Sequence, residues 1–158
     1  MTLSILNHTL TESKDVTNNW ICIRWSLNLS PTESVFLDWE VKQEFRKHDS
    51  LEGVEIRDLD IQRVPIDIQR RIQDILDGGE ITHFTAIKID TEVPMHQHTT
   101  DSEIYFGGND GSVVLLDWSQ ARIGKFDLGD DIFTIARIGY SHGVRSKNGT
   151  TFFGVKFK

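Results

Sequence analysis

The chain has 158 residues, of which 26% are charged and 38% are hydrophobic, and it carries a net charge of −7. This length fits a single domain with its own core, and no stretch approaches the roughly 20 apolar residues needed to cross a membrane. The acidic balance and the lack of a lysine or arginine cluster argue against nucleic acid as a partner. Small molecules or proteins remain as possible partners.

The first predicted element is a strand over residues 19–29, "NWICIRWSLNL". Its apolar residues alternate and would share one face of an extended chain: Ile21, Ile23, Trp25, Leu27 and Leu29. The residues before it show neither the basic start nor the apolar stretch of a secretory signal. The single cysteine, Cys22, allows no internal disulfide. These features predict a cytoplasmic protein.

Two helices are predicted next. In "SPTE", Ser30 is a capping residue, Pro31 suits the first helical position and Glu33 completes a capping box. We expect this helix over residues 31–47, covered on two sides because its apolar residues spread around more than one face. In residues 64–79, apolar residues at i, i+4, i+7 and i+8 predict a second helix with one buried stripe.

The pattern changes near residue 80. Nine of the twelve glycines follow residue 100, where short alternating runs are separated by turn signals such as "GGNDG" and "SKNG". Seven or eight strands are expected in about 78 residues, which is typical of a small antiparallel β-barrel or sandwich. The predicted organisation is therefore a mostly β unit over residues 81–158, with the N-terminal strand and helices of residues 1–80 packed on it.

The stretch "VPMHQHTTDSEIYFGG" at residues 93–108 contains two histidines one residue apart. In a strand, the side chains of His96 and His98 point to the same face. A bend after them would let Glu103 return a carboxylate to the same point. His142, in "IGYSHGV", is a fourth candidate and is expected in a glycine-framed turn. Such a set suits a divalent transition metal, with iron, manganese, nickel and zinc all open.

These residues resemble the two motifs of the cupin superfamily. The first has the form G-x5-H-x-H-x3,4-E-x6-G, and the second has the form G-x5-P-x-G-x2-H-x3-N. The first motif is matched at His96, His98 and Glu103, and the second at Gly139 and His142. The resemblance covers about residues 81–158. It implies a cupin β-barrel, or jelly roll, with His96, His98, Glu103 and His142 as metal ligands.

The departures from the cupin motifs fall on framing positions. Asp90 and Asp131 stand where the motifs have glycine, Arg137 replaces proline and Ser146 replaces asparagine, while the trailing glycine of the first motif comes one residue late at Gly111. Every ligand position is kept. The alternative is a metal-free barrel in which the histidines bond to one another or to water.

Two further side chains are predicted to contact a substrate. Tyr105 shares a face with Glu103 and could hydrogen-bond a substrate or act as an acid or base; otherwise it is a cavity-lining aromatic. Arg137 could bind a carboxylate or phosphate, or be solvated on the barrel wall. Of the other histidines, His48 is expected at the surface and His83 in the barrel wall.

The cupin resemblance permits three functions: Lewis-acid catalysis on a small oxygenated substrate, dioxygenase chemistry, or non-catalytic ligand sensing. We predict a metal-dependent enzyme that acts on a sugar or a keto or hydroxy acid, and a binding or regulatory protein is the alternative. The N-terminal half carries no catalytic signature. It would either close one end of the barrel or form a homodimer contact.

Overall fold

The structure, a computed structural model, describes residues 9–10, 23–26, 28–75, 79–97, 102–108, 110–116, 119, 122–129, 132–136 and 141–158. The N-terminal half contains β1 (Thr9–Leu10), β2 (Ile23–Ser26), α1 (Pro31–Val41), β3 (Arg46–Lys47), β4 (Val54–Leu59), a 3-10 turn (Ile61–Arg63) and α2 (Ile66–Ile75). The strands that follow are β5 (Ile81–Ile89), β6 (Glu92–His96), β7 (Ser102–Phe106), β8 (Gly111–Leu116), β9 (Arg122–Asp127), β10 (Ile132–Ala136), β11 (Ser141–Ser146) and β12 (Thr150–Phe157).

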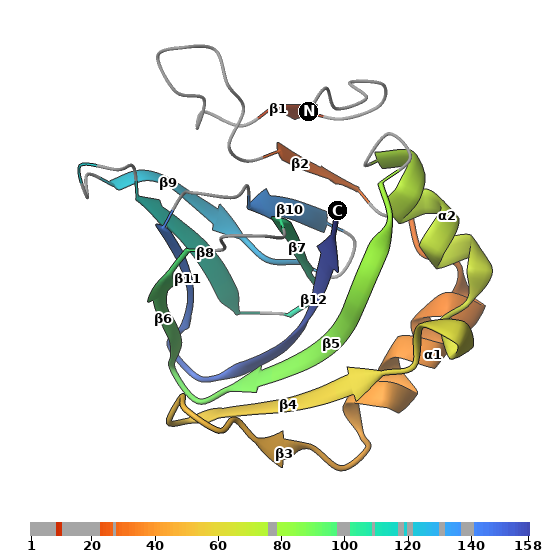
Figure 1. Cartoon of the computed structure of the whole chain (residues 1–158), viewed down its shortest axis with the longest axis horizontal. Coiled ribbons are helices and arrows are strands. Elements are labelled where there is room, and N and C mark those ends of the chain that lie inside the picture. Colours follow the sequence, from red (N-terminus) through yellow and green to blue (C-terminus); the bar gives the residue numbers. More distant parts are fainter. Residues whose placement is uncertain are drawn as a thin grey trace.

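The strands form two antiparallel sheets that face each other. The larger has the order β1-β2-β10-β7-β12-β5-β4-β3, and the smaller has the order β6-β11-β8-β9. Figure 1 shows the smaller sheet opposite the curved strands β4, β5 and β12, with α1 and α2 outside the larger sheet. This arrangement is a jelly-roll sandwich, and it confirms the predicted mostly β class with two helices.

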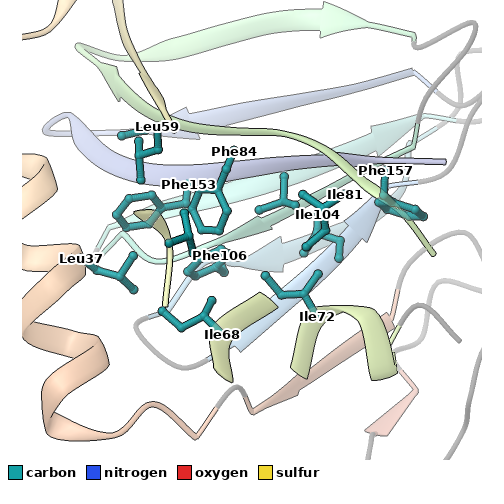
Figure 2. Packing of buried hydrophobic residues seen from close by; sticks show 13 residues of the cluster. Leu37, Leu59, Ile68, Ile72, Ile81, Phe84, Ile104, Phe106, Phe153 and Phe157 are labelled. Atoms are coloured by element: carbon teal, nitrogen blue, oxygen red, sulfur yellow. The ribbon is translucent and has the colours of Figure 1, made fainter. Parts of the chain in front are cut away.

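The main hydrophobic core lies between the two helices and the outer face of the larger sheet. Ile68 and Ile72 of α2 are fully buried, as the predicted apolar stripe requires. They meet Leu37 of α1 and the sheet residues Phe84 and Phe106 (Figure 2). Phe84 contacts Phe106 edge-on, with ring centroids 5.9 Å apart.

The first helix is shorter and less covered than predicted. Its N-terminal capping box is present, because Ser30 and Glu33 exchange hydrogen bonds between side chain and backbone. The helix ends at Val41 rather than near residue 47, where β3 instead pairs with β4. The expectation of cover on two sides is wrong for the described chain: Val35 is 66% exposed and Trp39 is 48% exposed.

Strand β4 was not predicted from the sequence. Its six residues pair with β5 from Val54 opposite Ile89 to Leu59 opposite Phe84, so one sheet contains strands from both sides of residue 80. Charged residues at three of its six positions concealed the strand. Beyond residue 80, the expected seven or eight strands are present as β5 to β12. Of the described helices, neither is long and apolar enough to span a bilayer.

Candidate metal and substrate site

The inner face of the larger sheet lines a cavity of about 590 Å³ between the two sheets. The wall contains apolar side chains from several strands, among them Val54, Ile56, Ile87, Val93, Val144 and Phe152. Its polar lining includes His48, Asp58, His83, Thr85, His96, Glu103, Tyr105 and Lys156. An apolar body flanked by a few polar groups is the usual composition of a small-molecule site.

Two of the predicted ligands lie side by side on the smaller sheet. His96, the last residue of β6, is the cross-strand partner of His142 on β11. Their ring centroids are 4.4 Å apart and the rings are tilted by 55°. His142 lies in a strand and is fully buried, which corrects the expectation of a turn.

Gly143 allows β6 and β11 to approach at this point. A Cβ atom on Gly143 would lie 2.8 Å from the carbonyl oxygen of Val93 and 2.9 Å from Sδ of Met95. The pairing register also shifts between His142 and Val144. The glycine after His142 therefore serves close strand packing, which brings the two imidazoles together.

The hydrogen bonding of His96 suits a metal ligand. Its Nδ1 lies 2.8 Å from the carbonyl oxygen of Pro94. A carbonyl can only accept, so Nδ1 carries the proton and the ring lone pair is on Nε2. Donation of the second ring N–H to a backbone carbonyl is the usual support of a metal-bound histidine.

Glu103 and Tyr105 come from β7 in the opposite sheet. They are two residues apart, share the inner face, and are both buried, with Tyr105 only 2% exposed. The Tyr105 hydroxyl lies 2.9 Å from Nε2 of His142. Burial raises the pKa of Tyr105 well above its usual value, and the nearby Glu103 carboxylate raises it further.

The structure thus brings His96, Glu103, Tyr105 and His142 into one region. His98 and Arg137 lie outside the described residues. Among those that are described, no three His, Cys, Asp or Glu side chains are arranged to hold a metal ion. Two imidazoles and a carboxylate are suitable donors for a divalent transition metal, but His142 presents its Nε2 to Tyr105.

The cavity lining also includes His48, His83 and Lys156, none of which belongs to the predicted ligand set. His48, expected at the surface, is half-buried, and its Nδ1 accepts backbone N–H groups from Ser50 and Leu51. His83 lines the cavity, in keeping with its expected place in the barrel wall. Lys156 was missed, although the alternation of "TTFFGVKF" places it on the same face as Phe152 and Gly154.

No protein-family model and no curated protein matches the chain. Among solved structures, it is similar to an oxidoreductase of the 2OG-Fe(II) oxygenase family from Burkholderia pseudomallei, with a TM-score of 0.64, 9% identity, and coverage of 87% of this chain and 84% of that one. A prolyl-4-hydroxylase from Pseudomonas putida gives a TM-score of 0.62 at 11% identity, with coverage of 87% and 92%.

An oxalate decarboxylase from Lactobacillus farciminis gives a TM-score of 0.48 at 12% identity. The match covers 75% of this chain and 32% of that protein, so this chain spans about a third of its length. A likeness this weak carries no argument. At 9% and 11% identity, the two stronger matches show the fold alone. The chain has a cupin fold, as predicted from the motifs.

Proposed function

We propose that this protein is a metal-dependent cupin enzyme that acts on a small organic acid bound between its two sheets. The observation that carries the proposal is the arrangement of His96, which donates its Nδ1–H to the Pro94 carbonyl and places its ring beside that of His142, tilted by 55°. That arrangement fixes the tautomer that a metal requires.

His96, His98, Glu103 and His142 would hold the ion. A divalent transition metal supplies Lewis acidity toward a substrate oxygen and, if it is redox-active, a route to dioxygen chemistry. Glu103 is buried on the larger sheet, opposite the histidine-bearing sheet, so its carboxylate would provide the negative charge within an apolar enclosure.

Lys156 favours an acid as the substrate. It is the cross-strand partner of both His83 on β5 and Glu103 on β7, and all three line the cavity. Within the described ranges, no carboxylate lies within 4.0 Å of its ammonium group. A substrate carboxylate would provide the missing counter-charge.

The carboxylate of Asp58 on this wall already has a counter-charge. Asp58 lies 3.3 Å from the Arg46 guanidinium and accepts a hydrogen bond from the Thr85 hydroxyl. Between Lys156 and the apolar lining, Gly154 keeps the wall open beside Glu103, because it has no side chain. The cavity would therefore accept a keto or hydroxy acid with its carboxylate at Lys156 and its reacting oxygen toward His96.

Elemental analysis of the purified protein tests the metal site. We expect about one transition-metal ion per chain, and we expect His96→Ala and His142→Ala each to lose most of it. His83→Ala is the matched control, because it removes a cavity histidine outside the ligand set and should keep the metal. No metal in the wild type after incubation with iron, manganese, nickel and zinc would contradict the proposal.

Turnover of a panel of keto acids, hydroxy acids, sugars and diols tests the substrate class. We expect acids to be preferred and Lys156→Met to raise KM at least tenfold, through loss of a charge-assisted hydrogen bond. Lys88→Met, on the opposite face of β5, should leave KM unchanged. Tight stoichiometric binding without product would support the binding-protein alternative instead.

A further inference from the structure

A phenol of the opposite sheet meets one of the proposed metal ligands. The Nε2 atom of His142 lies 2.9 Å from the Tyr105 hydroxyl, inside the protein. At the neighbouring His96, the hydrogen bond to Pro94 places the ring lone pair on Nε2.

The hydrogen bond between Tyr105 and His142 engages the Nε2 atom in either direction. A hydroxyl that donates occupies the Nε2 lone pair, and a hydroxyl that accepts requires the ring proton on Nε2. In both cases Nε2 cannot bind a metal ion until the hydroxyl leaves it.

We propose that Tyr105 competes with the metal ion for one of its ligands, the Nε2 atom of His142. Metal loading requires the Tyr105 hydroxyl to release this nitrogen. The competition presupposes the metal site proposed above.

The Tyr105 ring itself is held in place by packing. It contacts the Phe152 ring edge-on, with centroids 5.8 Å apart, and belongs to the inner apolar cluster with Val93 and Val113. Replacement by phenylalanine keeps this ring and removes only the hydroxyl. The competition can therefore be abolished without opening a cavity.

Titration of the metal-free protein with Co²⁺ or Zn²⁺ tests the proposal. We expect Tyr105→Phe to bind the ion about tenfold more tightly than the wild type, which corresponds to about 1.4 kcal/mol. Thr85→Val is the matched control. It removes a hydroxyl from the same cavity wall, and this hydroxyl hydrogen-bonds Asp58 rather than a proposed metal ligand. Its affinity for the ion should equal that of the wild type.

Imidazole nitrogen shifts measured by NMR supply a readout that does not depend on affinity. In the metal-free proteins, the Nε2 shift of His142 should differ between the wild type and Tyr105→Phe, because the variant lacks the hydroxyl that meets this nitrogen. The Nδ1 shift of His96 should be the same in both. An unchanged Nε2 shift of His142 in the variant would overturn the proposal.

The possible failures are distinguishable. Equal or weaker metal binding by a folded Tyr105→Phe variant overturns the competition and leaves the metal site standing. Metal binding by neither protein overturns the proposed function together with the competition. Binding by the variant alone would support the competition in its strongest form.

Discussion

The two faces of the larger sheet are built from the same strands but serve different ends. The outer faces of β5, β7 and β12 present Phe84, Phe106 and Phe153 to the helices in a closed apolar core. Their inner faces present His83, Glu103, Tyr105 and Lys156 to a cavity. Because side chains alternate along a strand, one sequence carries both patterns, and stability and binding can be altered separately.

The largest expected effect is on the outer face. Phe84→Ala removes a ring that is 1% exposed and contacts both Phe106 and Phe153, so we expect the free energy of unfolding to fall by about 3 to 5 kcal/mol. Urea denaturation measures this loss. Metal content per folded chain should not change, and a loss of metal with little loss of stability would break the separation between the faces.

A partly buried ion pair gives the outer layer a dependence on pH. Burial raises the pKa of Glu33, but hydrogen bonds from Arg71 and Ser30, together with the charge of Arg71, outweigh burial and lower the pKa from its ordinary value of 4.5. This stabilisation is complete above the unfolded-state value and is lost as pH falls through the lower folded-state pKa.

Glu33→Gln should therefore reduce the free energy of unfolding by about 2 kcal/mol at pH 7. Its difference from the wild type should shrink as pH falls below 4.5 toward the folded-state pKa. Chemical denaturation at a series of pH values measures both. A difference that is independent of pH would show that the ion pair is not its source.

Two glycines within the sheets should respond differently to the same substitution. In Gly143→Ala, the added methyl meets the backbone oxygen of Val93 at 2.8 Å, and we expect a loss of about 1 to 3 kcal/mol. In Gly154→Ala, the nearest atom is the side-chain tip of Ile87 at 3.1 Å, which can shift, so the loss should be below about 1 kcal/mol. Thermal unfolding of both variants measures the two losses. A larger loss in Gly154→Ala than in Gly143→Ala would contradict this expectation.

The smallest expected effect on stability is at Lys156. The side chain is exposed and has no ion-pair partner in the described chain, so Lys156→Met should change the free energy of unfolding by less than about 0.5 kcal/mol. Thermal unfolding without ligand checks this. A larger loss would mean that Lys156 supports the fold rather than a substrate.

Local signals made much of the fold predictable. The capping box at Ser30 and the apolar stripe of α2 depend on neighbouring residues, and both were predicted. The strand β4 was not, because its charged residues concealed the alternation of Val54 and Ile56. The place of Lys156 in the cavity could have been predicted from β12, because side chains alternate along a strand and Lys156 shares one face with Phe152 and Gly154.

The contacts of the candidate site depend on long-range pairing. His96 and His142 are 46 positions apart, and their approach is set by the β6–β11 register and Gly143. The bond between Tyr105 and His142 joins the two sheets. The sequence motif predicted the candidate metal ligands. It did not predict that a tyrosine would hydrogen-bond one of them.

Anomalous diffraction from crystals grown with Zn²⁺ or Co²⁺, collected above and below the metal edge, tests the central claim most directly. We expect an edge-dependent peak about 2.1 Å from Nε2 of both His96 and His142, with the Tyr105 hydroxyl no longer bonded to His142. A peak elsewhere, or none at these histidines with Tyr105 still on His142, would contradict the assignment of this pair as the metal site.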